Sequence, residues 1–232
     1  MLIDHSNDSV LEVLESRDKA TLVAWLMSAK DKGLLGSLEE VTTDMWDGYV
    51  EAVQEVFGPR VRITIDRFHV MKNFQECLNQ ARRQIQRELP KEAAKALKGT
   101  RWLWLTNPEN LEEEKRKEME RLKVQFPRLA ALSAQREALR QIFEDRTIST
   151  AEQGVARLKE WCRSALALGV AGLETFCKTL GNWMDKIANY FISRSSNGQT
   201  EGFNRGIRSI LWRAFGIPNF AHLRLRILHT LG

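Results

Sequence analysis

The first third of the chain alternates between two patterns of hydrophobic and polar residues. Short apolar or β-branched runs predict strands at 10–14, 40–43 and 61–65. Amphipathic stretches between these runs predict two helices, one capped by Asp18 and one at 45–57 that is closed by Gly58 and Pro59. Strands separated by helices of about a dozen residues are typical of βαβ crossovers and a parallel sheet, with chemistry at the carboxyl ends of the strands.

After Asp66 the pattern changes, and from residue 67 to about residue 231 only helical periodicity is found. Helices are expected at 68–89, 90–97, 109–125, 127–143, 149–168 and 170–191, and again from Thr200 onward. A loop of small polar residues at 193–199 precedes the last of these helices. The predicted fold class is therefore α/β, with every expected strand before Asp66.

Composition narrows the class of protein. Of the 232 residues, 43% are hydrophobic and 28% are charged, as in ordinary globular chains. No apolar run approaches the ~18 residues that span a bilayer, and the first residues lack the features of a signal peptide. The three cysteines share no CxxC spacing, so neither disulfides nor a zinc site is indicated. We expect a cytoplasmic protein that has reduced cysteines and no membrane partner.

The net charge of +5 is concentrated near the C-terminus. From residue 194 onward the chain has one acid, Glu201, no lysine and six arginines: Arg194, Arg205, Arg208, Arg213, Arg224 and Arg226. Guanidinium groups match phosphate oxygens, so one interpretation is a surface that binds nucleic acid. The other is that these arginines close helix C-termini and pair with acids elsewhere in the fold. The composition leaves both interpretations open.

Three acids occupy positions at which metal sites are often built. Asp44 and Asp66 follow predicted strands, and Glu201 lies in the first turn of the helix expected from Thr200. Helical spacing places four residues on one face of that helix: Glu201, Arg205, Arg208 and Trp212. Its other face is apolar: Phe203, Ile207, Ile210, Leu211 and Ala214. Clustered carboxylates bind Mg²⁺ or Mn²⁺ in two-metal phosphoryl transfer. The simpler explanation of Glu201 is that an acid is favoured at the positive end of the helix dipole.

A histidine follows one of these acids at short spacing. His69 lies three residues after Asp66, in the first turn of the long helix predicted at 68–89. An Asp-x-x-His pair can bind a metal ion, although two ligands alone make an incomplete site. The alternative is a histidine that stabilises the start of its own helix by hydrogen bonding.

Four motifs are more specific than composition or spacing. They are Val41-Thr-Thr-Asp-Met-Trp-Asp-Gly-Tyr49, Asp66-Arg-Phe-His-Val-Met-Lys-Asn73, Asn197-Gly-Gln-Thr-Glu-Gly-Phe-Asn-Arg-Gly-Ile-Arg208 and Arg213-Ala-Phe-Gly-Ile-Pro-Asn-Phe220. In their order, and over nearly the whole chain, these motifs closely resemble the transposases of the ISL3 family of bacterial insertion sequences.

The resemblance implies an incomplete ribonuclease-H-like sheet that is interrupted by a large all-helical insertion. Residues 1–74 then form the N-terminal part of the catalytic core, residues 75–192 the insertion, and residues 193–232 the C-terminal core helices with the third acid. The strand at 10–14 and the residues around Asp4 resemble the β-hairpin of the family.

The resemblance also implies DDE chemistry. In this chemistry two ions, Mg²⁺ or Mn²⁺, activate water and then a DNA 3′-hydroxyl for attack on phosphodiesters at transposon ends and in target DNA. Asp44 matches the second acid and Glu201 the third, so both are expected to be catalytic and to bind metal. Asp66 and His69 match a supporting motif. The protein is expected to bind DNA as a homo-oligomer. The residues expected to contact DNA are Asn204, Arg205, Arg208 and Arg213.

The sequence also departs from the family. The upstream DNA-binding segments and the first core strand, with the first catalytic Asp, are not found, and Asp4 lies at a hairpin position instead. We therefore expect an N-terminally truncated transposase that is inactive alone and marginally stable, because a missing central strand exposes two strand edges. The alternatives are a non-catalytic DNA-binding remnant that acts through the C-terminal arginines, and a helical scaffold with accidental acids.

Overall fold

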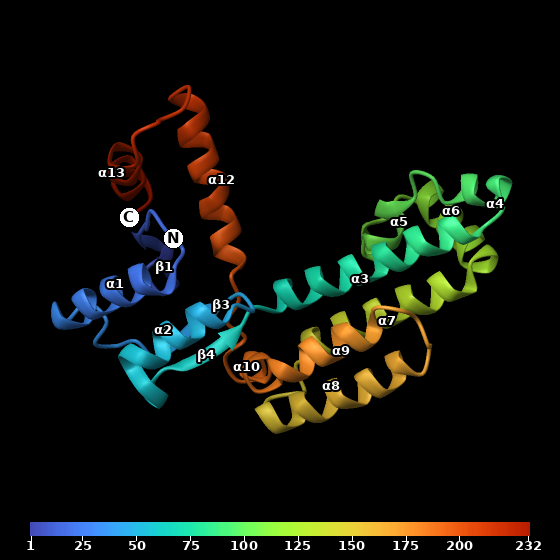
Figure 1. Ribbon diagram of the computed structural model, residues 1–232, viewed down its shortest axis with the longest axis horizontal. Helices are drawn as coiled ribbons and strands as arrows, with labels where there is room; N and C mark the ends of the chain where they lie inside the picture. Colours follow the sequence, from blue (N-terminus) through green and yellow to red (C-terminus); the bar gives the residue numbers. More distant parts are fainter. The chain divides into compact units, whose positions relative to one another are not determined.

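The computed structural model describes residues 1–232, apart from the side chains of Gln199 and Glu201 (Figure 1). The chain forms two compact units. The first contains Met1–Phe68 and Ser195–Gly232, and the second contains His69–Arg194. Both ends of the chain therefore belong to the same unit. Within the described part of the chain, no helix combines the length and the apolar character that crossing a bilayer requires.

The first unit is mixed α/β. Its elements from the N-terminal segment are β1 (Leu2–Asp4), β2 (Ser9–Glu12), α1 (Lys19–Asp31), β3 (Glu40–Thr43), α2 (Asp47–Phe57), η1 (Gly58–Arg60) and β4 (Arg62–Ile65). Its C-terminal elements are α12 (Gly198–Arg213) and α13 (Phe220–Leu231). The strands form two separate two-stranded sheets. The fold class predicted from the sequence, α/β with few strands, is confirmed at this level.

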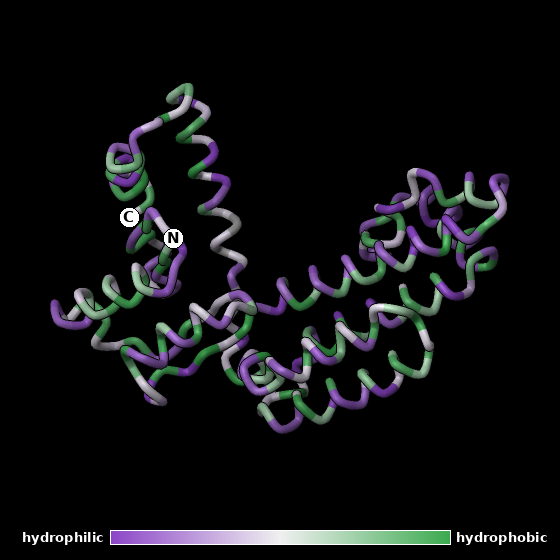
Figure 2. Tube along the Cα trace, in the orientation of Figure 1, coloured by the Kyte–Doolittle hydropathy of each residue, from purple (hydrophilic) through white to green (hydrophobic). Residues whose placement is uncertain are grey.

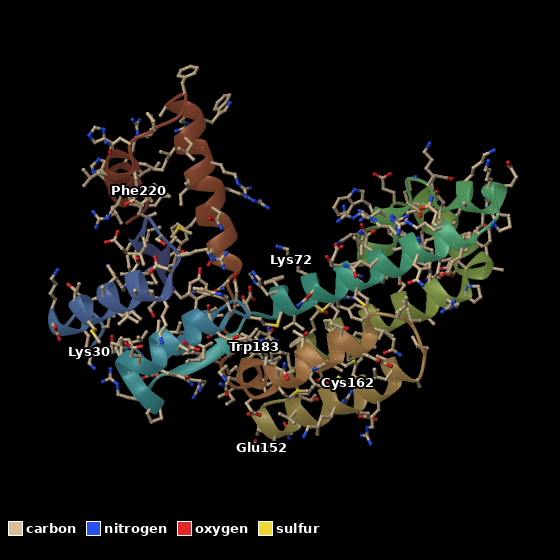
Figure 3. The ribbon with its side chains drawn as sticks, viewed as in Figure 1. Lys30, Lys72, Glu152, Cys162, Trp183 and Phe220 are labelled. Carbon is tan, nitrogen blue, oxygen red and sulfur yellow. The ribbon has the colours of Figure 1, made fainter. Side chains whose placement is uncertain are left out.

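The β3-α2-β4 segment is the crossover that the alternating pattern predicted. Strands β3 and β4 pair in parallel, with Glu40 opposite Arg62 and Thr43 opposite Ile65. Helix α2 buries its apolar residues, Val50, Ala52, Val53, Val56 and Phe57. Helix α1 packs against α2, and Lys30 at its end donates a hydrogen bond to the Val56 carbonyl (2.7 Å; Figure 3). Asp18 caps α1 as expected, by accepting from the Thr21 amide (2.8 Å).

The alternating pattern placed the strand at 10–14 in a parallel sheet, which is wrong, whereas the hairpin implied by the family resemblance is confirmed by β2. It pairs antiparallel with β1, with Ile3 opposite Val10 and Asp4 opposite Ser9. The short turn between the two strands permits only an antiparallel neighbour. The Asp4 carboxylate accepts hydrogen bonds from the Ser6 amide (2.8 Å) and the Asn7 amide (3.2 Å), so it stabilises this turn.

The two ends of the chain share one hydrophobic cluster. Val10 of β2, Ile210 of α12 and Ile227 of α13 are buried at its centre. Partly buried residues pack around them: Met1, Val13, Phe203, Ile207, Ile217, Leu223, Leu228 and Leu231. Figure 2 shows hydrophobic and hydrophilic positions mixed along α12 and α13, as expected for helices with two different faces. The apolar face predicted for α12 is confirmed for Phe203, Ile207 and Ile210.

The second unit is helical throughout the residues described. It contains most of α3 (Arg67–Glu88), followed by α4 (Lys91–Ala96), α5 (Arg101–Leu105), η2 (Pro108–Asn110), α6 (Glu113–Gln125), α7 (Pro127–Glu144), α8 (Ala151–Leu166), α9 (Leu173–Asn182), α10 (Met184–Ala188) and α11 (Tyr190–Ser193). Its core contains edge-to-face contacts of Phe74 with Trp161 (ring centroids 5.4 Å apart) and with Phe176 (5.0 Å).

Several predicted helices differ in extent from the observed ones; the helix expected at 109–125, for example, begins as α6 at Glu113. The helix expected at 170–191 is divided into α9, α10 and α11, because the backbone of Trp183 (φ −106°, ψ 5°; Figure 3) leaves the helical region and another break follows at Asn189. The helix expected from Thr200 begins at Gly198 instead, so the predicted loop at 193–199 is shorter. The small residues of this segment resemble loop residues, but two of them lie inside the helix.

Candidate functional site

Asp44 and Asp66 lie side by side at the carboxyl ends of β3 and β4. The strand register ends with Thr43 opposite Ile65, and the Asp66 amide donates to the Thr43 carbonyl (3.0 Å). Each aspartate is the next residue along its strand, so the parallel pairing brings the two backbones together. Asp44 is half-buried, and Asp66 is only 2% exposed. The structure thus brings together two of the three acids predicted from the sequence.

The carboxylate of Asp66 is attached to the start of α3. Its Oδ1 accepts a hydrogen bond from the Phe68 amide (3.1 Å), within the first turn of the helix. An N-terminal cap of this kind satisfies an amide that has no partner inside the helix. Burial and capping together give Asp66 a role in positioning the end of β4 and the start of α3.

The residues after Asp44 form a compact aromatic turn. The Trp46 amide donates to the Asp44 carbonyl (2.9 Å), and the rings of Trp46 and Tyr49 meet edge to face, 4.3 Å between centroids. The guanidinium of Arg17 lies 5.1 Å from the centre of the Trp46 ring, within range of a cation–π interaction. A methyl group at Gly48 would lie 2.5 Å from that ring, which explains the glycine in the motif. These contacts fix the backbone that carries Asp44.

The segment that leads into α12 runs beside the β3-β4 sheet. The Ser195 hydroxyl donates to Glu40 Oε2 (3.0 Å), and Glu40 also accepts a hydrogen bond from the Thr64 hydroxyl. Further along, a methyl group at Gly198 would lie 3.9 Å from the ring of Phe68, two residues after Asp66. The beginning of α12 is therefore placed next to the edge at which the two aspartates lie. The prediction for Glu201 concerns a side chain that lies outside the described residues, although its backbone belongs to the first turn of α12.

His69 lies in the first turn of α3, where the sequence predicted it, and it is half-buried. It is the first residue of the second unit, whereas the two aspartates belong to the first. Its predicted supporting role stays a prediction.

Arg194 has a structural role in the second unit. Its guanidinium donates to the carbonyls of Phe143 (2.9 Å), Asp145 (2.8 Å) and Ile148, where α7 ends. It also lies 5.3 Å from the ring centres of Tyr190 and Phe191. Carbonyls at a helix C-terminus lack intrahelical partners, and a cation interacts favourably with them. Arg194 therefore follows the structural interpretation of the C-terminal arginines.

Arg224 also has a structural role, because it forms an ion pair with Glu12 that connects α13 to β2. Its Nε donates to Glu12 Oε1 (2.5 Å), and a second guanidinium nitrogen donates to Oε2. Burial favours the neutral form of Glu12, but hydrogen bonds from Arg224 and from the Val13 amide outweigh it and hold the pKa of Glu12 below its ordinary value.

The remaining candidates for contact with DNA lie on the outer face of α12. Asn204, Arg205, Arg208 and Arg213 are all exposed. They lie on sides of the helix away from Phe203, Ile207 and Ile210, which pack into the hydrophobic cluster. The structural interpretation thus holds for Arg194 and Arg224, whereas for the exposed arginines of α12 the nucleic-acid interpretation stays a prediction. The sequence lacked a signal for this distinction, because it depends on what each side chain meets in the fold.

The donor atoms at this edge fit a hard divalent cation in part. Asp44 and Asp66 offer the carboxylate oxygens that Mg²⁺ and Mn²⁺ prefer. Among the side chains that the structure describes, no group of three or more His, Cys, Asp or Glu residues is placed to hold a metal ion. The first turn of α12 contains Glu201, and its predicted role as a further metal ligand stays a prediction.

Comparison with known proteins matches the chain to a protein family. Residues 1–227 match the family model of the ISL3-type DDE proteins, which is described as transposase. One relative is the transposase for insertion sequence element IS1001 of Bordetella parapertussis, which is 24% identical over an alignment of 232 residues. The alignment covers 98% of this chain and 55% of the relative, so the chain spans about half the length of that protein. No solved structure matches the chain.

Proposed function

Because the chain belongs to the ISL3 family of DDE transposases, we propose that it takes part in metal-dependent cleavage and transfer of DNA strands at the ends of an insertion sequence. The observation that carries this proposal is the edge formed by Asp44 and Asp66, with the start of α12 beside it. An acid cluster at the ends of adjacent parallel strands is suited to binding metal ions at a phosphodiester.

We propose that the first unit is part of a ribonuclease-H-like core, and that the second unit is the helical insertion into this core. The division of the chain at Phe68 and Ser195 supports this arrangement. The bounds proposed from the sequence, 1–74, 75–192 and 193–232, differ from this division by two to six residues. The first acid of the triad has no assigned position in this chain, and Asp4 is engaged in the turn between β1 and β2.

Each residue at the edge has a separate part in this proposal. Asp44 and Glu201 hold a Mg²⁺ or Mn²⁺ ion, which supplies Lewis-acid activation of the attacking oxygen and stabilises charge on the phosphate. Asp66 supports the site by fixing the start of α3, and His69 lies in the same turn. Asn204, Arg205, Arg208 and Arg213 bind the DNA backbone from the exposed face of α12, because guanidinium groups pair with phosphate oxygens.

The metal site is tested by titrating the full chain with Mn²⁺ and measuring the bound ion by calorimetry or by the loss of its free EPR signal. We expect one weakly bound ion, with binding at least about tenfold weaker in Asp44→Asn and in Glu201→Gln. Glu152→Gln, which changes an exposed acid on α8 (Figure 3), is the matched control and should bind Mn²⁺ as the unmodified chain does. Equal binding by all four proteins would exclude the site.

A second candidate function is DNA binding without catalysis, and the exposed arginines of α12 favour it. For this second function, the affinity for duplex DNA should fall as the salt concentration rises and should not require a metal ion. Each phosphate contact contributes about −0.9 to the slope of log K against log salt, so replacing Arg208 or Arg213 by Gln should reduce the slope by about 1. DNA binding that persists in EDTA, in a chain that binds no Mn²⁺, would favour this function over the first.

A further inference from the structure

Two aromatic side chains project into solvent at the C-terminal end of α12. Trp212 is 82% exposed, and Phe215, just after the helix, is 101% exposed. Other apolar residues of the same helix, such as Ile210, are buried in the cluster with Val10 and Ile227. Leaving two large rings in water forgoes the stabilisation that their burial would give, and adjacent exposed apolar groups commonly mark a binding surface.

The turn that carries these rings is held by backbone hydrogen bonds. The Phe215 amide donates to the Trp212 carbonyl (3.1 Å), and the Gly216 amide donates to the Leu211 carbonyl (2.9 Å). Phe215 has a φ of 52° and Gly216 a φ of 90°, so both lie in the left-handed region. This conformation is unfavourable for a phenylalanine, and it ends the helix with the ring turned away from the core. The two rings are thus presented on an ordered turn.

Positive charge surrounds the two rings. Arg208 lies one turn before Trp212 on the same helix face, and Arg213 follows Trp212 directly. No acid occurs between residues 202 and 232. The expected partner of this surface is therefore anionic and offers flat groups to the rings. DNA with unpaired bases meets both conditions, because aromatic side chains stack on bases of any sequence while cationic groups follow the phosphates.

We propose that Trp212 and Phe215 form a stacking site for unpaired bases of the DNA strand that lies along α12. The proposal rests on the proposed function, since it takes the arginine face of α12 as the DNA surface. Bases inside a duplex are already stacked on their neighbours, so the site acts on single-stranded or opened DNA. Trp212 follows Glu201 by 11 residues, which is about 16 Å along the helix and about five nucleotide steps of a DNA strand.

The test compares three DNA probes by fluorescence anisotropy with the full chain: a 15-nucleotide single strand, the matching duplex, and that duplex with five unpaired bases at its centre. The variants are Trp212→Ala, Trp212→Phe and Phe215→Asn. Asparagine is chosen at position 215 because it tolerates the left-handed conformation. We expect Trp212→Ala to weaken binding of the single strand and of the opened duplex about 5- to 100-fold. Its affinity for the closed duplex should stay within about twofold, and Trp212→Phe should restore most of the loss.

Trp102→Ala is the matched control, because Trp102 is another exposed tryptophan (66%) beside an arginine, Arg101, on a different helix. It should bind all three probes as the unmodified chain does. Equal loss on open and closed DNA in Trp212→Ala, or no loss on either, would overturn the stacking site. A dimer that Trp212→Ala dissociates without DNA would overturn it too, since the partner would then be a second copy.

The test separates this inference from the function on which it rests. Unchanged affinity in Trp212→Ala together with weaker binding in Arg208→Gln would refute stacking and keep the DNA surface. Unchanged affinity in both variants would refute the DNA surface itself, and the stacking site with it.

Discussion

The ion pair between Glu12 and Arg224 connects the two ends of the chain, and removing its positive partner should destabilise the first unit. Glu12 is 7% exposed, and the side chain of Arg224 is 37% exposed. In Arg224→Met the aliphatic part of the side chain is largely retained, but the carboxylate of Glu12 loses both guanidinium hydrogen bonds. The Val13 amide (2.8 Å) remains as a donor to the carboxylate.

The size of the effect follows from this partial burial. Breaking a fully buried ion pair costs about 3–5 kcal/mol, because it leaves an unpaired charge. Exposed pairs contribute only about 0–1 kcal/mol. With Glu12 buried, Arg224 partly in solvent and the hydrogen bonds from the Val13 amide and the Trp25 side chain retained, we expect a loss of about 1–3 kcal/mol at pH 7.

The dependence on pH has a defined sign. In the unmodified protein the pKa of Glu12 is lowered, so the pair adds stability that is complete above the unfolded pKa of about 4.3 and is lost as pH falls through the folded value. In Arg224→Met the guanidinium no longer offsets burial, so we expect the folded pKa of Glu12 to rise above that of the unfolded chain. The variant therefore recovers stability as pH falls from 7 toward 4.5, and the gap between the two proteins narrows.

Urea denaturation followed by circular dichroism at several values between pH 4.5 and pH 8 measures this gap. Arg226→Met, an exposed arginine on the same helix, is the matched control and should change stability by less than about 0.5 kcal/mol. The double variant Glu12→Gln with Arg224→Met should recover part of the loss, because no charge is left buried. A gap that does not change with pH, or an equal loss in Arg226→Met, would refute the role assigned to the pair.

Three further predictions concern single contacts. Gly154→Ala places a methyl group 2.1 Å from the buried ring of Phe191 and should reduce the free energy of unfolding by about 1–3 kcal/mol, measured as a lower thermal midpoint. Gly181→Ala is the control, because its methyl group meets no atom within 4 Å and should not lower the midpoint. Arg194→Lys cannot reach all three carbonyls at the end of α7 and should cost about 1–3 kcal/mol in urea denaturation. Asp18→Ala removes the cap of α1 and should lower the urea midpoint, whereas Asp18→Asn should retain the capping hydrogen bond and the midpoint. Because the pKa of Asp18 is lowered to about 2, the cap should persist down to that pH.

The elements of the fold were largely predictable because each depends on a local pattern. Period-two and β-branched runs predicted β3 and β4, and apolar spacing predicted the buried face of α2. The pattern alone placed β2 in a parallel sheet, because a strand pattern does not indicate its neighbour, whereas the family resemblance implied the hairpin. The breaks at Trp183 and Asn189 were missed because the apolar spacing continues through both residues.

The candidate site was predictable only in part, and for a similar reason. Asp44 and Asp66 were found because residues that end parallel strands meet at one edge. The contact of Ser195 with Glu40 joins residues 155 positions apart, and the contact of Arg17 with Trp46 depends on how α1 packs. No local pattern signals either contact. Contacts between residues that are far apart in the sequence also decide which arginines are structural and which face solvent.

The direction of the proposed DNA-binding face of α12 follows from contacts near both ends of this helix. Its first turns are positioned by Ser195 on Glu40 and by Gly198 beside Phe68. Further along, Ile210 is packed against Val10 and Ile227, which come from opposite ends of the chain. Because Phe203, Ile207 and Ile210 pack into this cluster, rotation of α12 about its axis would expose apolar side chains. Arg208 and Trp212 are exposed on the side of α12 away from the cluster, so the core of the first unit sets the direction of the face that is proposed to bind DNA.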